Sequence, residues 1–202
     1  MAVFTGPLFE YSPYMAHNRS DIQRHAERAV PDQAAEILMA GRVAHVAFTE
    51  DGQPFAIPFG YQFDSSEPRL LYLHGSHASR ALAIAASGAP LCITVTLLDG
   101  LVYSKTAMNH SINYRSVVCF GRGAEVTDSD HQQRVYEAMI KRYFPGRTQG
   151  RDFAPPSSAQ LEGTRLVEVV IDDWSAKARE GGPTGPLDLD EQSPGTCGVM
   201  PI

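Results

Sequence analysis

The chain has 202 residues, with 17 Lys and Arg against 23 Asp and Glu, which gives a formal net charge of −6 at pH 7. Nucleic-acid binding depends on clustered positive side chains that neutralise phosphates, so this balance argues against a nucleic-acid partner. No apolar run approaches the roughly 20 residues that span a bilayer, and we expect no membrane partner either. The length suits one domain, residues 1–202, with a sizeable core.

The start of the chain lacks the basic segment and apolar core of a secretory signal. The cysteine count is odd, with Cys92, Cys119 and Cys197, and the first two fall in predicted strands. These features predict reduced thiols in a cytoplasmic protein. No two cysteines have zinc spacing, and His74 and His77 lack further ligands nearby, so no metal site is predicted.

Residues 1–30 form an irregular N-terminal arm that carries several aromatic side chains, and we expect it to lie on the body of the protein or on a partner subunit. A short helix is predicted over 31–40, because proline suits the first helical turn and Gly41 suits the stop. Strands follow over 43–48 and 54–63, joined by an Asp51-Gly52 hairpin turn.

Pro58 lies in the middle of the second of these strands and cannot donate a ladder hydrogen bond. Two interpretations are open. The segment is a plain edge strand, or the backbone groups around Ile57 and Phe59 face a flat polar ligand. His45, on the first strand, alternates with Val43 and Ala47, which predicts a packed strand histidine.

The stretch from Leu70 to Asp99 organises the rest of the chain. It predicts a strand over 70–73, a polar turn, a helix over 78–86 and a second long strand. Ser79 and Arg80 fall in the first helical turn, where free backbone N–H groups also lie. A hydroxyl, a guanidinium and these N–H groups together can hold a phosphate. A capped helix with a surface arginine is the alternative.

Beyond this stretch, Asp99-Gly100 predicts a turn, and Gly121 and Gly123 predict a bulge or bend in a later strand. The remaining expected elements are a strand over 101–108, a polar and aromatic loop over 109–116, a strand over 117–127, a helix over 128–144, a strand over 164–172 and an extended C-terminal tail over 181–202. About six strands joined mostly by hairpins, with three or four short helices, predict a mainly β fold. The expected architecture is an antiparallel barrel with peripheral helices.

The sequence lacks the motifs of two common classes of enzyme. No serine lies in a Gly-x-Ser-x-Gly elbow, which argues against a hydrolase of that type. No glycine-rich dinucleotide motif opens a strand–helix unit, which argues against a Rossmann site for NAD.

The ordered segments GRVAHVAF, DGQPFAIPFGY, LYLHGSHASR, CITVTLLDGLVYSK, HSINYRSVVCFGRG and SAKAREGGP resemble those of the pyridoxamine 5′-phosphate oxidase-like flavoproteins. The similar branch comprises flavin-nucleotide-binding proteins related to nitroimidazole-resistance proteins. The match runs from about Arg24 to the end of the chain. The resemblance implies an FMN-binding split β-barrel, a homodimer with the cofactor at the subunit interface.

The resemblance also implies which residues contact FMN. Ser79 and Arg80 would hold the phosphate, and His74 would lie in the same pocket and have a catalytic role. The implied cofactor-binding residues are Ala56, Ile57, Pro58, Phe59, His74, Gly75, Ser76, Ser79, Arg80, Asn113, Tyr114, Arg115, Ser116, Lys177 and Arg179.

The chain departs from true pyridoxamine-phosphate oxidases at two places. Ala81 replaces the basic residue that usually follows the Ser-Arg pair, and SAKAREGGP replaces the substrate-binding Arg-His-Arg type of motif. Oxidation of pyridoxine phosphate is therefore not expected. The main hypothesis is an FMN-dependent oxidoreductase acting on a small organic substrate, in which His74 donates a proton.

Two alternatives to the main hypothesis stay open. One is a non-catalytic flavin carrier or sensor. The other is a cleft that takes haem, with His74 or His110 as axial ligand.

Overall fold

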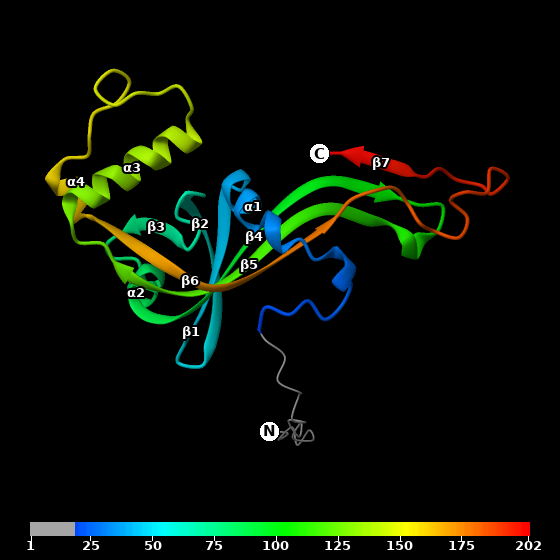
Figure 1. Ribbon diagram of the computed structural model, residues 1–202, viewed down its shortest axis with the longest axis horizontal. Coiled ribbons are helices and arrows are strands. Elements are labelled where there is room, and N and C mark those ends of the chain that lie inside the picture. Colours follow the sequence, from blue (N-terminus) through cyan, green and yellow to red (C-terminus); the bar gives the residue numbers. More distant parts are fainter. Residues whose placement is uncertain (1–18) are drawn as a thin grey trace, which may run out of the picture.

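A computed structural model describes residues 19–202 of the chain (Figure 1). Within this range, seven strands form one antiparallel sheet in the order β1-β2-β3-β6-β5-β4-β7, and pairing between β1 and β4 closes the first six into a barrel. The strands are β1 (Val43–Glu50), β2 (Gln53–Phe63), β3 (Leu70–Ser76), β4 (Ser87–Tyr103), β5 (Ser111–Glu125), β6 (Thr164–Arg179) and β7 (Gly198–Pro201). The predicted antiparallel barrel is confirmed, and the extra seventh strand comes from the C-terminal tail.

Four α-helices accompany the barrel in the described part of the chain: α1 (Ala34–Ala40), α2 (Arg80–Ala86), α3 (Ser129–Tyr143) and α4 (Ser158–Glu162). The predicted helices 31–40, 78–86 and 128–144 are confirmed with slightly shorter bounds, the first preceded by a 3₁₀ turn over Pro31–Gln33. None of the helices found in residues 19–202 is long and apolar enough to cross a membrane.

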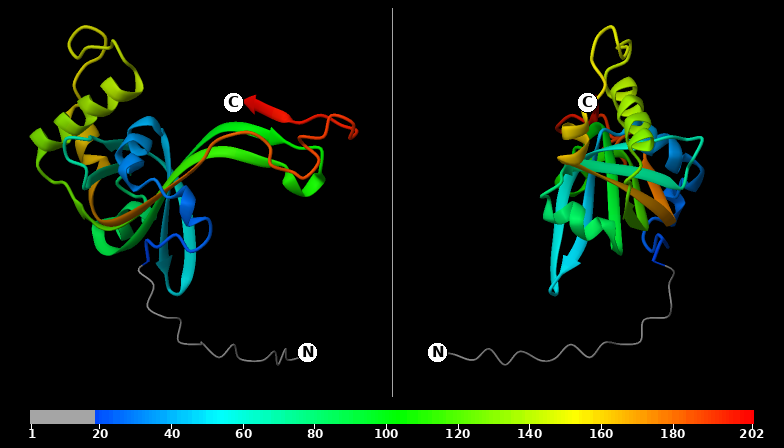
Figure 2. Two further views of the ribbon diagram at one scale, coloured as in Figure 1. Left: turned by 45° about the vertical axis from the view of Figure 1, so that its right-hand side comes forward. Right: turned by 90° about the vertical axis from the view of Figure 1, so that its left-hand side faces the viewer.

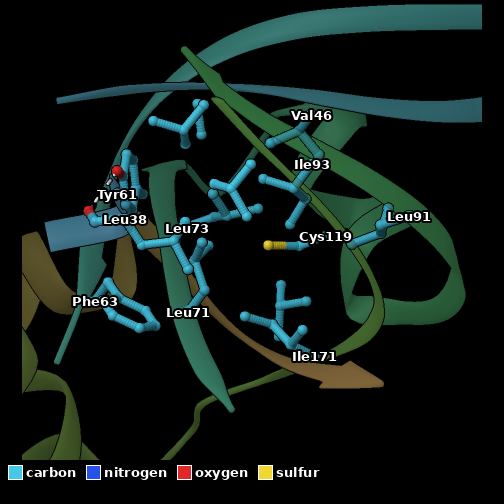
Figure 3. Packing of buried hydrophobic residues seen from close by; sticks show 14 of the residues in the cluster. Leu38, Val46, Tyr61, Phe63, Leu71, Leu73, Leu91, Ile93, Cys119 and Ile171 are labelled. Atoms are coloured by element: carbon cyan, nitrogen blue, oxygen red, sulfur yellow. Dashed lines mark hydrogen bonds between the residues drawn. The ribbon is translucent and has the colours of Figure 1, made fainter. Parts of the chain in front are cut away.

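The barrel interior is filled by alternate residues of the strands and by the apolar faces of α1 and α2. Figure 3 shows part of this core, where Leu71 and Leu73 of β3 meet Ile93 of β4 and Cys119 of β5. Tyr61 is fully buried and its hydroxyl donates to the Leu38 carbonyl at 2.6 Å. Every second residue of a strand can thus be buried in the barrel, which explains why the apolar runs of the sequence fold as strands.

The N-terminal arm lies outside the described residues up to position 18. From residue 19 onward it approaches the body of the protein, as expected. The Val30 amide donates to the Ala176 carbonyl at 2.9 Å, and Lys177 Nζ donates to the Arg24 carbonyl at 2.7 Å. These contacts join the arm to β6.

Two predicted boundaries between β4 and β5 are wrong. Asp99-Gly100 makes no turn, because β4 continues through it with a register shift between Leu98 and Gly100. The expected loop over 109–116 is largely strand, since β5 begins at Ser111. The extension is possible because β7 pairs with the outer half of β4 and supplies the missing neighbour.

The prediction for His45 is also wrong, because its side chain is exposed while Ala44 and Val46 point into the core. The bulge predicted near Gly121 is confirmed between Phe120 and Gly121. A Cβ at Gly121 would lie 2.2 Å from the Val170 carbonyl oxygen, so no larger residue fits there without a backbone shift.

The outer halves of β4 and β5 leave the barrel as a projecting arm, and β7 runs along it (Figures 1 and 2). The C-terminal tail is held to this arm by Asp188. Its carboxylate accepts hydrogen bonds from the Lys105 amide at 2.8 Å, from Ser104 Oγ at 2.9 Å and from the Gly185 amide at 2.5 Å.

Helix α3 is attached to the outside of the barrel through its last turn. Arg142 stacks on the Tyr61 ring, 4.6 Å from its centroid, and donates to the carbonyl of Leu38 at 2.7 Å. The Tyr143 hydroxyl donates to the Arg42 carbonyl at 2.7 Å and lies 3.0 Å from the Tyr61 amide nitrogen, which donates to it.

The first prediction concerns the acid sensitivity of the C-terminal tail. Burial raises the pKa of Asp188, but the hydrogen bonds from Lys105, Ser104 and Gly185 outweigh it and lower the pKa overall. A carboxyl with a lowered pKa stabilises the folded state above its unfolded pKa of about 3.9, and this contribution is lost as pH falls through the folded value. The protection of the β7 amides against hydrogen exchange, taken relative to their intrinsic exchange rates at each pH, should therefore fall on acidification below about pH 4. In Asp188→Asn, exchange should be fast already at pH 7; equal protection in both proteins at pH 7 would contradict the role of Asp188.

The second prediction concerns the attachment of α3. Tyr143→Phe removes the partner of the Tyr61 amide and should lower the free energy of unfolding by about 1–3 kcal/mol, as urea denaturation would measure. Tyr136→Phe on the same helix is the matched control. The Tyr136 hydroxyl is buried and has no hydrogen-bond partner among residues 19–202, so its removal should cost nothing. Equal losses in both variants would rule out the stated attachment.

Candidate functional site

Arg80 is the first residue of α2 and lies next to the β1–β2 hairpin. Its guanidinium is 3.1 Å from a Glu50 carboxylate oxygen and 4.4 Å from the centroid of the Phe55 ring. The side chain is 58% exposed, so most of its donors stay available to a ligand. Ser79 is the N-cap of the helix, and its hydroxyl accepts a hydrogen bond from the Leu82 amide. Ser79 and Arg80 therefore lie next to each other, as predicted. The Arg80 guanidinium is accessible to a ligand, whereas the Ser79 hydroxyl caps the helix.

Pro58 lies in the part of β2 that pairs with β1 alone, because pairing with β3 begins only at Tyr61. This part of β2 is thus an edge with one free side, which either interpretation of Pro58 requires. Ile57 and Phe59 pack against the core, whereas Ala56 and Pro58 are exposed. This stretch leaves one backbone edge and one exposed face available beside Arg80.

Asn113, Arg115 and Arg179 line a second, polar pocket of about 860 Å³ where the projecting arm meets the barrel. Arg115 makes a bidentate ion pair with Asp99 at 2.7 and 3.1 Å, and the guanidinium lowers the pKa of that carboxyl. Arg179 donates to the Asn113 side-chain oxygen. Most of the charge in this pocket is thus already paired within the chain.

The other predicted residues of this region, Tyr114, Ser116 and Lys177, do not line this pocket. Tyr114 pairs in register with Arg179, and Ser116 with Lys177. The structure brings this group together on β5 and β6, apart from Arg80.

His74 points away from the barrel interior into a cavity of about 530 Å³ beneath α3. Leu71 and Leu73 of the same strand face the core, so the outward direction of His74 follows from strand alternation. Burial lowers the pKa of His74, which makes the neutral imidazole its main form near pH 7. Its Nδ1 atom is shielded and has no hydrogen-bond partner within residues 19–202.

The walls of the His74 cavity are mainly apolar. They are formed by the underside of α3 and by the segment that returns through α4 to β6. The α3 side consists of Tyr136, Met139, Ile140, Tyr143 and Phe144, and the returning segment supplies Ala154, Pro156, Gln160, Leu161 and Thr164. A neutral imidazole in an apolar cavity of this size is suited to ligating a metal in a flat organic cofactor.

The structure separates residues that the sequence placed in one pocket. Gly75 follows His74 but faces the other way, since a Cβ there would lie 3.1 Å from Leu82 in the core. Arg80 lies at the β1–β2 hairpin and does not line the cavity of His74. Ser76 accepts a hydrogen bond from the Ala78 amide.

The α3 residues that line the cavity were not predicted as site residues. The wide apolar stripe of this helix was the signal that could have indicated them. His110, the alternative axial ligand, is exposed on the projecting arm, 3.2 Å from the Ala107 carbonyl oxygen.

Comparisons with known proteins agree with this fold. A family model described as pyridoxamine 5′-phosphate oxidase matches residues 31–178. The FAD and haem binding protein of Mycobacterium smegmatis is 31% identical with a TM-score of 0.76, over 87% of this chain and 84% of that chain. Flavocytochrome Anf3 of Azotobacter vinelandii is 30% identical with a TM-score of 0.78, over 92% and 85% of the two chains.

A more distant structure shares the fold alone. It is a protein assigned to 5-nitroimidazole antibiotic resistance from Bacteroides thetaiotaomicron, 18% identical with a TM-score of 0.61, over 75% of this chain and 90% of that chain. No curated protein matches the chain by sequence. The ordered motifs, the split barrel and the family match lead to one conclusion: the chain belongs to the pyridoxamine 5′-phosphate oxidase family.

Proposed function

We propose that this protein is a flavin-dependent redox protein that also holds a haem in the cavity at His74. The observation that carries the proposal is the neutral histidine in an apolar cavity, in a chain similar to a FAD and haem binding protein and to a flavocytochrome. Because His74 and Arg80 lie apart, we assign them to two separate sites, His74 to the haem and Arg80 to the flavin.

The His74 cavity fits a haem in size, polarity and ligand. Its volume lies within the roughly 300–1,000 Å³ of small-molecule sites, and its walls are largely apolar. An imidazole that is neutral near pH 7 has a lone pair for iron, which a protonated one lacks. For the same reason His74 is better suited to metal ligation than to donating a proton.

The flavin site is proposed at the exposed stretch of β2 and the start of α2. The accessible Arg80 guanidinium would contact the flavin phosphate, and the exposed edge at Ala56 and Pro58 would face the ring. The sequence motifs imply FMN. FAD, which the M. smegmatis protein binds, contains the same mononucleotide portion with an added adenylate.

An oxidoreductase acting on a small organic substrate is the proposed activity, and cytoplasmic location is proposed because all three cysteines are free thiols. Flavin supplies hydride or electron transfer and haem supplies one-electron chemistry, while the chain provides binding, water exclusion and a neutral ligand. Ala81 is buried in the core, so the basic residue typical of pyridoxamine-phosphate oxidases has no counterpart in the pocket.

We further propose that two copies associate through the exposed face of the sheet and arm. Leu101 of β4, Ile112 of β5 and Met200 of β7 are neighbours in register, and each side chain is 40–53% exposed. An apolar row on a thin projecting arm is costly in water unless another surface covers it. A second copy of the chain is the partner that the family resemblance implies.

The third prediction tests the two cofactor sites. Purified protein should show both a flavin absorption band and a haem Soret band. His74→Ala should remove the Soret band and keep the flavin, because only the axial ligand is lost. Arg80→Ala should weaken flavin binding by about tenfold to a hundredfold, as expected for one charge-assisted contact, and keep the haem.

The matched controls for these variants are His131→Ala, a histidine on α3 that bonds Tyr72, and Arg122→Ala, an exposed arginine on β5. Neither should change cofactor content. The mass of the extracted flavin distinguishes FMN from FAD. Reduction of the holoprotein by NADH or NADPH without oxygen supports an oxidoreductase, and retention of both cofactors without any turnover supports a carrier or sensor. A colourless protein that neither cofactor stabilises refutes the proposal.

The fourth prediction concerns the association of two copies. Light scattering should give a mass of twice 22.0 kDa for the wild type. Leu101→Lys places a charge in the apolar row and should shift the protein towards the monomer. Val170→Lys, at a similarly exposed position on β6 away from the arm, is the control and should stay dimeric. A monomeric wild type would exclude the proposed association.

A further inference from the structure

Two buried polar atoms on adjoining side chains lack hydrogen-bond partners among residues 19–202. They are His74 Nδ1 and the Tyr136 hydroxyl oxygen. Buried polar atoms in folded proteins are nearly always paired, and an unpaired one costs about 1–3 kcal/mol. Two such atoms beside one cavity therefore indicate a bond that forms only in another state of the site.

The two side chains already touch. His74 on β3 and Tyr136 on α3 make an edge-to-face ring contact, with centroids 5.7 Å apart and planes at 72°. Tyr143 also lines the cavity, but its hydroxyl is committed to the Arg42 carbonyl and the Tyr61 amide. Of the two cavity tyrosines, Tyr136 is thus the one whose hydroxyl is free to pair with His74.

The direction of the bond follows from what a ligating histidine requires. Because Nδ1 is shielded while His74 lines the cavity, Nε2 is the nitrogen that can reach a cofactor. When Nε2 binds a metal, the proton of the neutral ring lies on Nδ1 and needs an acceptor. The Tyr136 hydroxyl oxygen has no partner among residues 19–202, and its lone pairs can accept this hydrogen bond.

We propose that Tyr136 is the positioning residue for His74: its hydroxyl oxygen accepts a hydrogen bond from Nδ1–H when the cavity is filled, and this fixes the tautomer that presents Nε2 to haem iron. The inference rests on the proposed haem site. The bond would form through rotation of a side chain or through a bridging water when the cavity is filled.

The test is Tyr136→Phe, measured in both the haem-free and the haem-loaded protein. Without haem, the variant should be as stable as the wild type or more so, because the removed hydroxyl is unpaired. With haem, it should keep a Soret band but lose haem to a scavenger about tenfold faster, since loss of such a partner typically costs 10–100-fold in metal affinity. Its reduction potential should become more positive, because an unsupported imidazole donates less electron density to iron.

Tyr72→Phe is the control for a merely structural effect, because the Tyr72 hydroxyl donates to the Glu168 carboxylate at 2.8 Å and Tyr72 does not line the cavity. It should lower the stability of the haem-free protein and leave the reduction potential at the wild-type value. A wild type without a Soret band overturns the proposed haem site and this inference with it. If the wild type binds haem but its rate of haem loss and its reduction potential equal those of Tyr136→Phe, the role of Tyr136 is refuted while the haem site stands. Unfolding of the haem-free Tyr136→Phe also overturns it, because the hydroxyl would then be paired.

Discussion

The contact between Arg142 and the barrel is the interaction on which the His74 cavity depends. The guanidinium stacks on Tyr61 and donates to carbonyl groups of Leu38 and Gly41, at the end of α1. A Cβ at Gly41 would lie 2.4 Å from a Val95 methyl carbon, so the chain can pass this point only without a side chain. One cation thus anchors the last turn of α3 to β2 and to the end of α1, and the His74 cavity lies beneath this helix.

Strand alternation then divides the chemistry of the chain between two surfaces. On β3, Leu71 and Leu73 enter the core, and His74 emerges on the other side towards α3. The strand ends, α2 begins, and Arg80 reaches back across to the β1–β2 hairpin. His74 and Arg80 are thus six positions apart in sequence but lie on different surfaces, because His74 leaves β3 on its outer face and the chain turns at the end of the strand before α2 begins.

Much of the barrel was predictable, because its strands carry their own alternating apolar pattern and most of its turns use local signals. The wrong predictions have one cause: contacts with residues distant in sequence decide the local structure at these positions. Asp99-Gly100 has turn chemistry, but pairing with β7 keeps β4 extended through it. His45 alternates correctly, yet its face is the outer one, and the pattern alone does not say which face is covered.

The sequence by itself determined the antiparallel barrel, the position of Arg80 at a helix start and the identity of His74 as a residue of interest. These follow from local periodicity, capping and ordered motifs, which act over a few residues. Only the tertiary structure decided that His74 and Arg80 lie on different surfaces, and that Tyr136 lies against His74. Tyr136 is 62 positions further along the chain than His74, and their contact exists only because α3 packs on the outer face of β3, an arrangement set by long-range burial that no local pattern encodes.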